Sequence, residues 1–133
     1  MEAKLKHLEM IQAIISRMAG NSFLLKGWSV TLVAALFALA VKDANVRYVY
    51  LAYFPCIVFW ILDGYFLWQE RLFRNLYNKV RMLTETDIDF SMDTSEFKKI
   101  RSWQDSIFSI TLRIFHGTVI GAIILVMLIM IIC

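Results

Sequence analysis

The chain has 133 residues, of which 59 % are hydrophobic and 19 % are charged, and its formal net charge is +3. A soluble domain normally has about 25 % charged residues, so this composition argues against a soluble domain with a core of its own. The sequence also lacks the GxSxG, HExxH, P-loop and GxGxxG patterns of common enzyme classes. We therefore expect a protein that is not an enzyme, with no catalytic residue, no metal site and no cofactor.

Residues 1–20 are expected to form an amphipathic helix in the cytoplasm. Apolar residues recur there at the three- and four-residue spacing of a helix face. They are Leu5, Leu8, Ile11, Ile15 and Met18. Charged residues interrupt the stretch, so it has no apolar signal-peptide region. Gly20–Ser22 is expected to break the helix before the first apolar run. The apolar face either lies on the inner leaflet or forms a coiled-coil seam between subunits, and the sequence leaves both open.

Three apolar runs follow, and each is long enough to cross a bilayer. The runs are Phe23–Val41, Tyr48–Trp68 and Ile107–Cys133. A hydrocarbon core of about 30 Å requires about 20 apolar residues in a helix. The last run is too short for a helical hairpin, so the number of spans is odd. The sequence predicts an all-α integral membrane protein with three transmembrane helices.

The second run continues without a break into a helical cytoplasmic extension that ends near Met82. The polar, acidic stretch Thr84–Asp93 shows no periodicity and is expected to be a loop. Asp93 and Glu96 resemble a capping box that opens a further helix, and Ser102 or Asp105 is expected to cap another before the last run. The expected segments are the amphipathic helix at 1–20, a transmembrane hairpin at 21–69, the cytoplasmic segment at 70–105 and the C-terminal transmembrane helix at 106–133.

Basic residues are unevenly distributed between the loops. Only Lys42 and Arg47 lie between the first two runs, whereas most other Lys and Arg precede the first run or follow the second. The positive-inside rule therefore places the N-terminus and residues 70–105 in the cytoplasm. Trp68 and Trp103 then lie near the inner membrane face, where tryptophan is enriched.

Four ionisable residues interrupt the apolar runs at similar depth near the inner face. They are Lys26, Asp63, Arg113 and His116. A charged residue at the bilayer centre costs about 2.5–3.5 kcal/mol on insertion scales, so such residues usually face a partner or a cavity. We expect Asp63 to pair with Lys26 or Arg113 in an intramembrane charge cluster or gate. The alternative for the two basic residues is that they extend to the lipid headgroups.

Small residues in two of the runs are expected to let helices approach closely. In the first run these are Gly27, Ala34 and Ala38, and in the third Gly117 and Gly121 form a GxxxG pair.

Two residues of the second run have expected effects on the backbone. Pro55 removes one backbone hydrogen bond and is expected to kink the helix. Gly64, next to Asp63, could allow the close approach of another helix.

A basic cluster follows the second run. Its members are Arg71, Arg74, Lys79 and Arg81. Juxtamembrane bases are generally attracted to anionic lipid by about 1 kcal/mol each. We expect these residues to contact membrane lipids or a protein partner, and we expect no specific nucleic-acid binding.

Three stretches together resemble a family of small, largely uncharacterised bacterial inner-membrane proteins. They are NSFLLKGW at 21–28, LDGYFLWQERLFR at 62–74 and DFSM at 89–92. The resemblance covers about residues 6–103 and brings no assigned catalytic residue. Proteins of this size and layout recur among the membrane effectors of bacterial phage-defence systems. The resemblance thus implies a multi-pass protein of the bacterial inner membrane, and its layout suggests a role in antiviral defence.

Two functions from different classes follow from these patterns. The first is a homo-oligomeric pore or membrane-perturbing effector, gated from the cytoplasmic side, with residues 70–105 receiving the trigger. The second is a non-conducting membrane anchor or accessory subunit that recruits a soluble protein through the same segment. A change in conductance or toxicity on Asp63→Ala substitution is expected only for the first.

Overall fold

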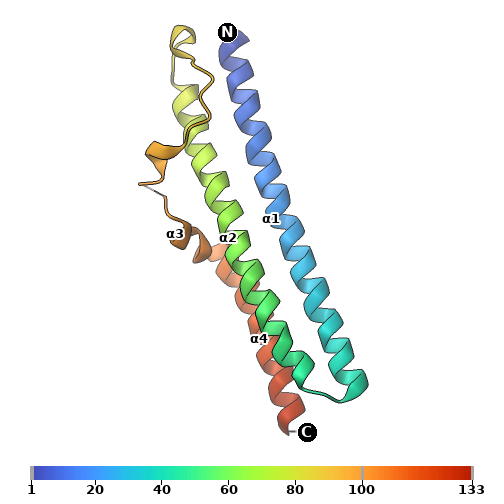
Figure 1. The fold of residues 1–133 in the computed structure, drawn as a ribbon. Coiled ribbons are helices and arrows are strands. Elements are labelled where there is room, and N and C mark those ends of the chain that lie inside the picture. The colour runs from blue at the N-terminus through green and yellow to red at the C-terminus, as the bar shows by residue number, and fades with distance from the viewer. Residues whose placement is uncertain (1, 100, 133) are drawn as a thin grey trace.

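The structure is a computed structural model that describes residues 2–99 and 101–132, so Met1, Ile100 and Cys133 lie outside it. Helices make up most of the described chain, and no strand occurs within it (Figure 1). The elements in order are α1 (Glu2–Asp43), α2 (Arg47–Arg81), the 3-10 helices η1 (Glu85–Asp87) and η2 (Ser95–Phe97), α3 (Trp103–Ile107) and α4 (Ile110–Ile132).

Helices α1 and α2 form a long hairpin along the whole molecule, and α4 lies beside the half of α2 that is nearer the hairpin turn (Figure 1). Ala44 in that turn has a φ of 51°, which places it in the left-handed region that L-residues seldom adopt. At 1.5 Å per residue, α1 is about 63 Å long, roughly twice the hydrocarbon thickness of a bilayer. The hairpin therefore has an apolar half, flanked by α4, and a polar half that extends beyond it.

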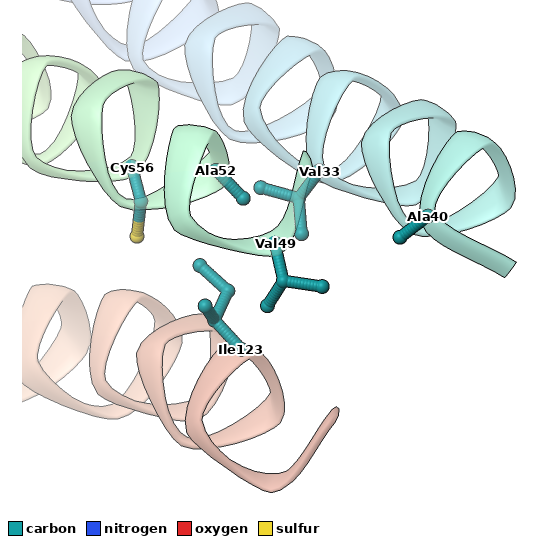
Figure 2. Packing of buried hydrophobic residues seen from close by; sticks show 6 residues of the cluster. All are labelled: Val33, Ala40, Val49, Ala52, Cys56 and Ile123. Atoms are coloured by element: carbon teal, nitrogen blue, oxygen red, sulfur yellow. The ribbon is translucent and has the colours of Figure 1, made fainter. Parts of the chain in front are cut away.

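The apolar half is held together by a cluster of buried residues from all three long helices. Figure 2 shows that Val33 and Ala40 of α1 face Val49 and Ala52 of α2, with Ile123 of α4 on the other side. Cys56 is also fully buried in this cluster, as expected for a small apolar side chain. The three spans predicted from the sequence correspond to three helices that are long and apolar enough to cross a membrane.

A second buried cluster lies in the polar half, where α1 packs on the extension of α2. Its buried members are Ile11 and Ile15 of α1 and Leu76 and Val80 of α2. The central part of the apolar face of residues 1–20 is thus covered by the same chain, whereas Leu5 remains exposed. A contact of this helix with the inner leaflet or with a second subunit stays a prediction.

The expected helix break at Gly20–Ser22 is wrong, because α1 continues through these residues. A glycine inside a helix costs only about 1 kcal/mol relative to alanine, and packing along α2 offsets this cost. Ser22 does not act as a cap, because its hydroxyl donates a hydrogen bond to Asp63 of α2. The boundary predicted between residues 1–20 and 21–69 therefore lies inside one helix.

Residues 83–97, which we call the strap, return along the polar half after α2 ends. Leu83, Ile88, Met92 and Phe97 pack on the second buried cluster. At its far end the Glu85 carboxylate accepts hydrogen bonds from the backbone N–H groups of Ala3 and Lys4, at 2.9 and 3.3 Å. The strap thereby satisfies backbone donors at the start of α1 that have no partner within the helix.

The capping box expected at Asp93 and Glu96 does not form. Asp93 instead accepts hydrogen bonds from the hydroxyl and the backbone N–H of Ser95, which hold the pKa of its carboxyl below the usual value. Glu96 binds Lys79 of α2, with 2.7 Å between the charged atoms. Only the short 3-10 helix η2 follows, because both acidic side chains are used elsewhere.

The short helix α3 leads into α4. Ser102 caps this helix as expected and accepts a hydrogen bond from the backbone N–H of Asp105. The helix ends at Ile107, and α4 begins at Ile110. Helix α4 therefore starts a few residues later than the boundary predicted at 106, because Phe108 interrupts the helix.

The strap also covers His7 of α1, which is fully buried. Its Nε2–H donates to the carbonyl oxygen of Ser91 at 2.8 Å, and the Phe90 ring lies against the imidazole. We expect His7→Leu to loosen the strap, because it leaves a carbonyl without its donor at a cost of about 1–3 kcal/mol. Trypsin cleavage after Lys98 should then become about tenfold faster. Glu9→Leu, at an exposed position of the same helix, serves as the control, and equal rates for both variants would contradict this role of His7.

Candidate functional site

The fully buried carboxylate of Asp63 lies where the apolar and polar halves of the protein meet. Asp63 projects from α2, and its Oδ2 lies 2.6 Å from Nζ of Lys26 on α1. The same oxygen lies 2.8 Å from Nε2 of His116 on α4. Oδ1 accepts a hydrogen bond from the Ser22 hydroxyl of α1. One carboxylate therefore connects all three long helices, and we call these four residues the Asp63 cluster.

Lys26 is the most accessible member of the Asp63 cluster. Its ammonium also donates to Ser22 Oγ at 2.8 Å and lies 5.8 Å from the centroid of the Phe115 ring. Ser22 and Lys26 meet because residues four apart lie on the same helix face. The side chain of Lys26 remains 19 % exposed, whereas that of Asp63 is fully buried. The cation thus reaches the carboxylate from the outside of the helix bundle.

His116 completes the cluster from α4. Because Asp63 accepts the bond, the Nε2 atom of His116 carries the donated proton. The imidazole stacks on the indole of Trp60, with 5.7 Å between centroids and 9° between the ring planes. Trp60 is itself fixed by a hydrogen bond from Nε1 to the carbonyl oxygen of Ile107, at 2.8 Å. The orientation of His116 is therefore set on two sides, by the carboxylate and by the indole.

This arrangement is suited to holding the three long helices together. The negative charge of Asp63 is balanced by Lys26, and every partner is on a different helix from Asp63. A buried charge left without its partner is costly, so the three helices are held in one relative position while the cluster is intact. Separation of the helices would release one negative and one positive charge at this depth.

The expected pairing of Asp63 therefore forms with Lys26 and not with Arg113. Arg113 is exposed, and within the described residues it has no ion pair. The reason is helix geometry, since Leu112 and His116 occupy the face of α4 that is buried. Arg113 lies beside that face and points away from the cluster.

The small residues predicted to mediate packing do not do so within this chain. A Cβ added to Gly27, Gly117 or Gly121 would meet nothing within 4 Å, and Ala34 and Ala38 are exposed. The buried face of α1 consists of other residues, among them Leu25, Ser29, Val33 and Ala40. The expected close approach does occur at Gly64, where an added Cβ would lie 3.0 Å from Ile107 Cα.

The remaining sequence-predicted residues lie outside the cluster. Helix α2 continues through Pro55, so the predicted kink stays a prediction. In the basic cluster, Arg74 pairs with Glu70 at 2.8 Å and Lys79 pairs with Glu96 of the strap. Arg71 is half-buried and Arg81 is exposed. Binding of lipid or of a partner by this set stays a prediction.

Sequence reasoning gave no role to His7 or Trp60, although both had a signal. His7 lies four residues before Ile11, so it falls within the apolar stripe of that helix. Trp60 lies three residues before Asp63 and so projects from nearly the same face of α2. Each could have been identified as a polar or aromatic residue that lies at helical spacing from a position expected to be buried.

The fold and the site define an all-helical protein with three helices able to span a membrane by length and composition, joined by one buried charge cluster. Comparisons with protein-family models, with curated proteins and with solved structures found no match to this chain.

Proposed function

We propose that this protein is a homo-oligomeric membrane pore or membrane-perturbing effector whose resting protomer is closed by the Asp63 cluster. The single observation that carries the proposal is the fully buried carboxylate of Asp63, bonded to α1 and α4 at the boundary between the apolar and polar halves. Ionisable residues at membrane depth generally mark function. Here the charges are balanced inside one protomer, which is the arrangement expected of a closed state.

Self-association is supported by the small residues that the protomer leaves uncovered. Gly27, Ala34 and Ala38 are exposed on α1, and Gly117 and Gly121 are exposed on α4. Transmembrane helices associate through such positions, since small side chains let backbones approach. Two of the three spans thus carry surfaces suited to a neighbouring copy.

The trigger in this proposal acts on the polar half. The strap is attached to α1 at His7 and at Ala3, and to α2 through Lys79. A ligand or protein that displaces the strap would change how α1 and α2 pack, and both helices continue into the Asp63 cluster. We place the protein in the bacterial inner membrane with this half in the cytoplasm, and we assign it to antiviral defence as part of the same proposal.

Ion leak from liposomes that contain the purified protein tests directly whether the Asp63 cluster keeps the pore closed. Asp63→Asn keeps the shape of the side chain but removes its charge, so it should raise potassium efflux about tenfold, the change that follows from losing about 1.4 kcal/mol of closed-state stabilisation. Arg113→Gln removes a charge at the same depth outside the cluster and should leak like wild type. Equal leak from both variants at equal protein content would contradict the proposal.

A non-conducting anchor is the second candidate. Exposed apolar side chains in and beside the strap favour it. Phe90 has a φ of 56° and is exposed, and Met82 beside the strap is exposed as well. In this alternative, a soluble partner would cover these two exposed side chains. Recovery of a stable complex with a soluble protein, lost on Phe90→Ser substitution and without membrane depolarisation, would favour the anchor over the pore.

A further inference from the structure

His7 of α1 is a titratable group that lies fully buried beneath the strap. Its Nε2–H donates to the carbonyl oxygen of Ser91 at 2.8 Å. The ring of Phe90 lies against the imidazole, with 5.5 Å between the ring centroids. We propose that His7 is an acid-sensitive switch, and that protonation of its imidazole releases the strap from α1.

The second ring nitrogen of His7 decides which form of the side chain the attached strap can hold. This atom, Nδ1, is buried and has no hydrogen-bond partner in the part of the chain that the structure describes. A neutral imidazole with its proton on Nε2 has only a lone pair at Nδ1. A charged imidazole would place a further N–H donor there, and a buried charged donor without an acceptor is costly. The attached strap therefore accommodates the neutral form and disfavours the charged one.

The charged residues around His7 do not supply the missing acceptor. On the three elements that pack together here they are Lys4 of α1, Glu85, Asp89 and Asp93 of the strap, and Lys79 and Arg81 of α2. The three carboxylates accept backbone N–H groups elsewhere, from Ala3, Ser91 and Ser95 in turn. Within the described residues none of them bonds to Nδ1 of the imidazole. A proton added to His7 thus has no carboxylate in place to balance it.

Release of the strap removes this restriction. Both ring nitrogens of His7 then reach water, where a histidine becomes charged below about pH 6.5. Phe90 has a φ of 56°, a conformation that L-residues seldom adopt, so release also relaxes the backbone beside Ser91. The contact of the strap with α2 through Lys79 and Glu96 is an exposed ion pair, which contributes little in water. The strap is therefore held at neutral pH and is released as the pH falls.

A distance measurement by pulsed electron spin resonance on the full-length protein in lipid nanodiscs tests the switch. The spin labels are attached at two exposed positions, through Thr86→Cys in the strap and Met10→Cys on α1, with Cys56→Ala and Cys133→Ser as background. From about pH 7.5 to about pH 5.5 the ratio of released to attached strap should rise about tenfold, because it follows the titration of a histidine in water. Carboxylates stay ionised over this range.

His7→Gln is the matched variant, because its amide N–H can donate to the Ser91 carbonyl but never carries a charge. It should keep the strap attached and change the ratio by less than about twofold over the same range. His7→Asn offers a second uncharged donor of shorter reach. A wild-type ratio that changes by less than about twofold, or a tenfold change in either uncharged variant, would overturn the proposal.

Nitrogen-15 resonances of the His7 imidazole test the switch in the wild-type protein, whatever the two variants do. Neutral and charged imidazoles differ in the protonation of their ring nitrogens. We expect the charged ring only in the population with the released strap. A charged ring in the attached population would overturn the proposal.

The switch does not rest on the pore. Strap position is measured as a distance, whereas closure by the Asp63 cluster is measured as ion leak from liposomes. A strap that stays attached in acid while Asp63→Asn still raises the leak would overturn the switch alone. A strap released by acid without any leak difference for Asp63→Asn would overturn the pore alone.

Discussion

Replacing Asp63 with leucine should cost about 3–5 kcal/mol of stability, the usual consequence of removing one partner from a buried ion pair. The loss has two sources in this structure. Lys26 would keep a charge beside an apolar side chain, and His116 would lose the acceptor of its Nε2–H at 2.8 Å. Thermal unfolding in detergent, followed by circular dichroism, measures the effect.

The double variant Lys26→Met/Asp63→Leu separates charge from shape. Buried ion pairs can often be replaced by apolar residues without net loss, so the double variant should recover most of the stability lost by Asp63→Leu. Arg113→Leu, outside the cluster, should change stability by less than about 0.5 kcal/mol. A cost below about 1 kcal/mol for Asp63→Leu would mean that Lys26 is readily satisfied at the headgroups, the alternative that the sequence left open.

Adding one methyl group at Gly64 should also destabilise the fold, by a smaller amount. In Gly64→Ala the new Cβ would lie 3.0 Å from Ile107 Cα and 3.2 Å from its Cβ, so backbone has to move. Overpacking of this kind costs about 1–3 kcal/mol. The displaced Ile107 carbonyl is the acceptor of Trp60 Nε1, so the support of His116 should weaken with it. We expect a lower unfolding temperature and altered tryptophan fluorescence.

Gly20 of α1 is the matched control for this substitution, because it lies outside the surfaces proposed for self-association. An added Cβ at Gly20 meets nothing within 4 Å. Alanine is favoured over glycine in helices by about 1 kcal/mol, so Gly20→Ala should be neutral or more stable than wild type. Gly64→Ala unfolding at or above the wild-type temperature would show that α3 adjusts freely and that this contact does not position it.

The three long apolar helices and the need of Asp63 for a partner could be predicted, because each has a signal in the local sequence. Run length predicts a span, and a carboxylate in hydrocarbon requires a partner. The choice of Lys26 over Arg113 could not be predicted, because it depends on the rotation of α1 and α4 about their axes. That rotation is set by packing at positions such as Leu25 and Leu112, which look like any other apolar residue in the sequence.

The predicted helix break at Gly20–Ser22 and the predicted capping box at Asp93 and Glu96 are both wrong, because tertiary contacts outweigh the local sequence preference. Gly20–Ser22 has the composition of a helix end, yet the helix continues because Ile15 and Leu25 on either side are buried against the rest of the protein. Asp93 and Glu96 have capping-box spacing, yet Glu96 pairs with Lys79, seventeen residues earlier in the chain. In both cases a contact between distant residues competes with the local preference, and sequence spacing does not reveal it.

The unbroken course of α1 has a mechanical consequence. Residues 7 and 26 are about 28 Å apart along one helix at 1.5 Å per residue, so the imidazole under the strap and the ammonium beside Asp63 are fixed to the same stiff rod. A hinge between His7 and Lys26 would allow the strap end of α1 to tilt or rotate without moving Lys26. Without it, a rotation of α1 by one residue's angle, about 100°, would carry Lys26 away from the carboxylate. In the proposed gating, a change in packing at the strap would therefore be transmitted along α1 to the Asp63 cluster.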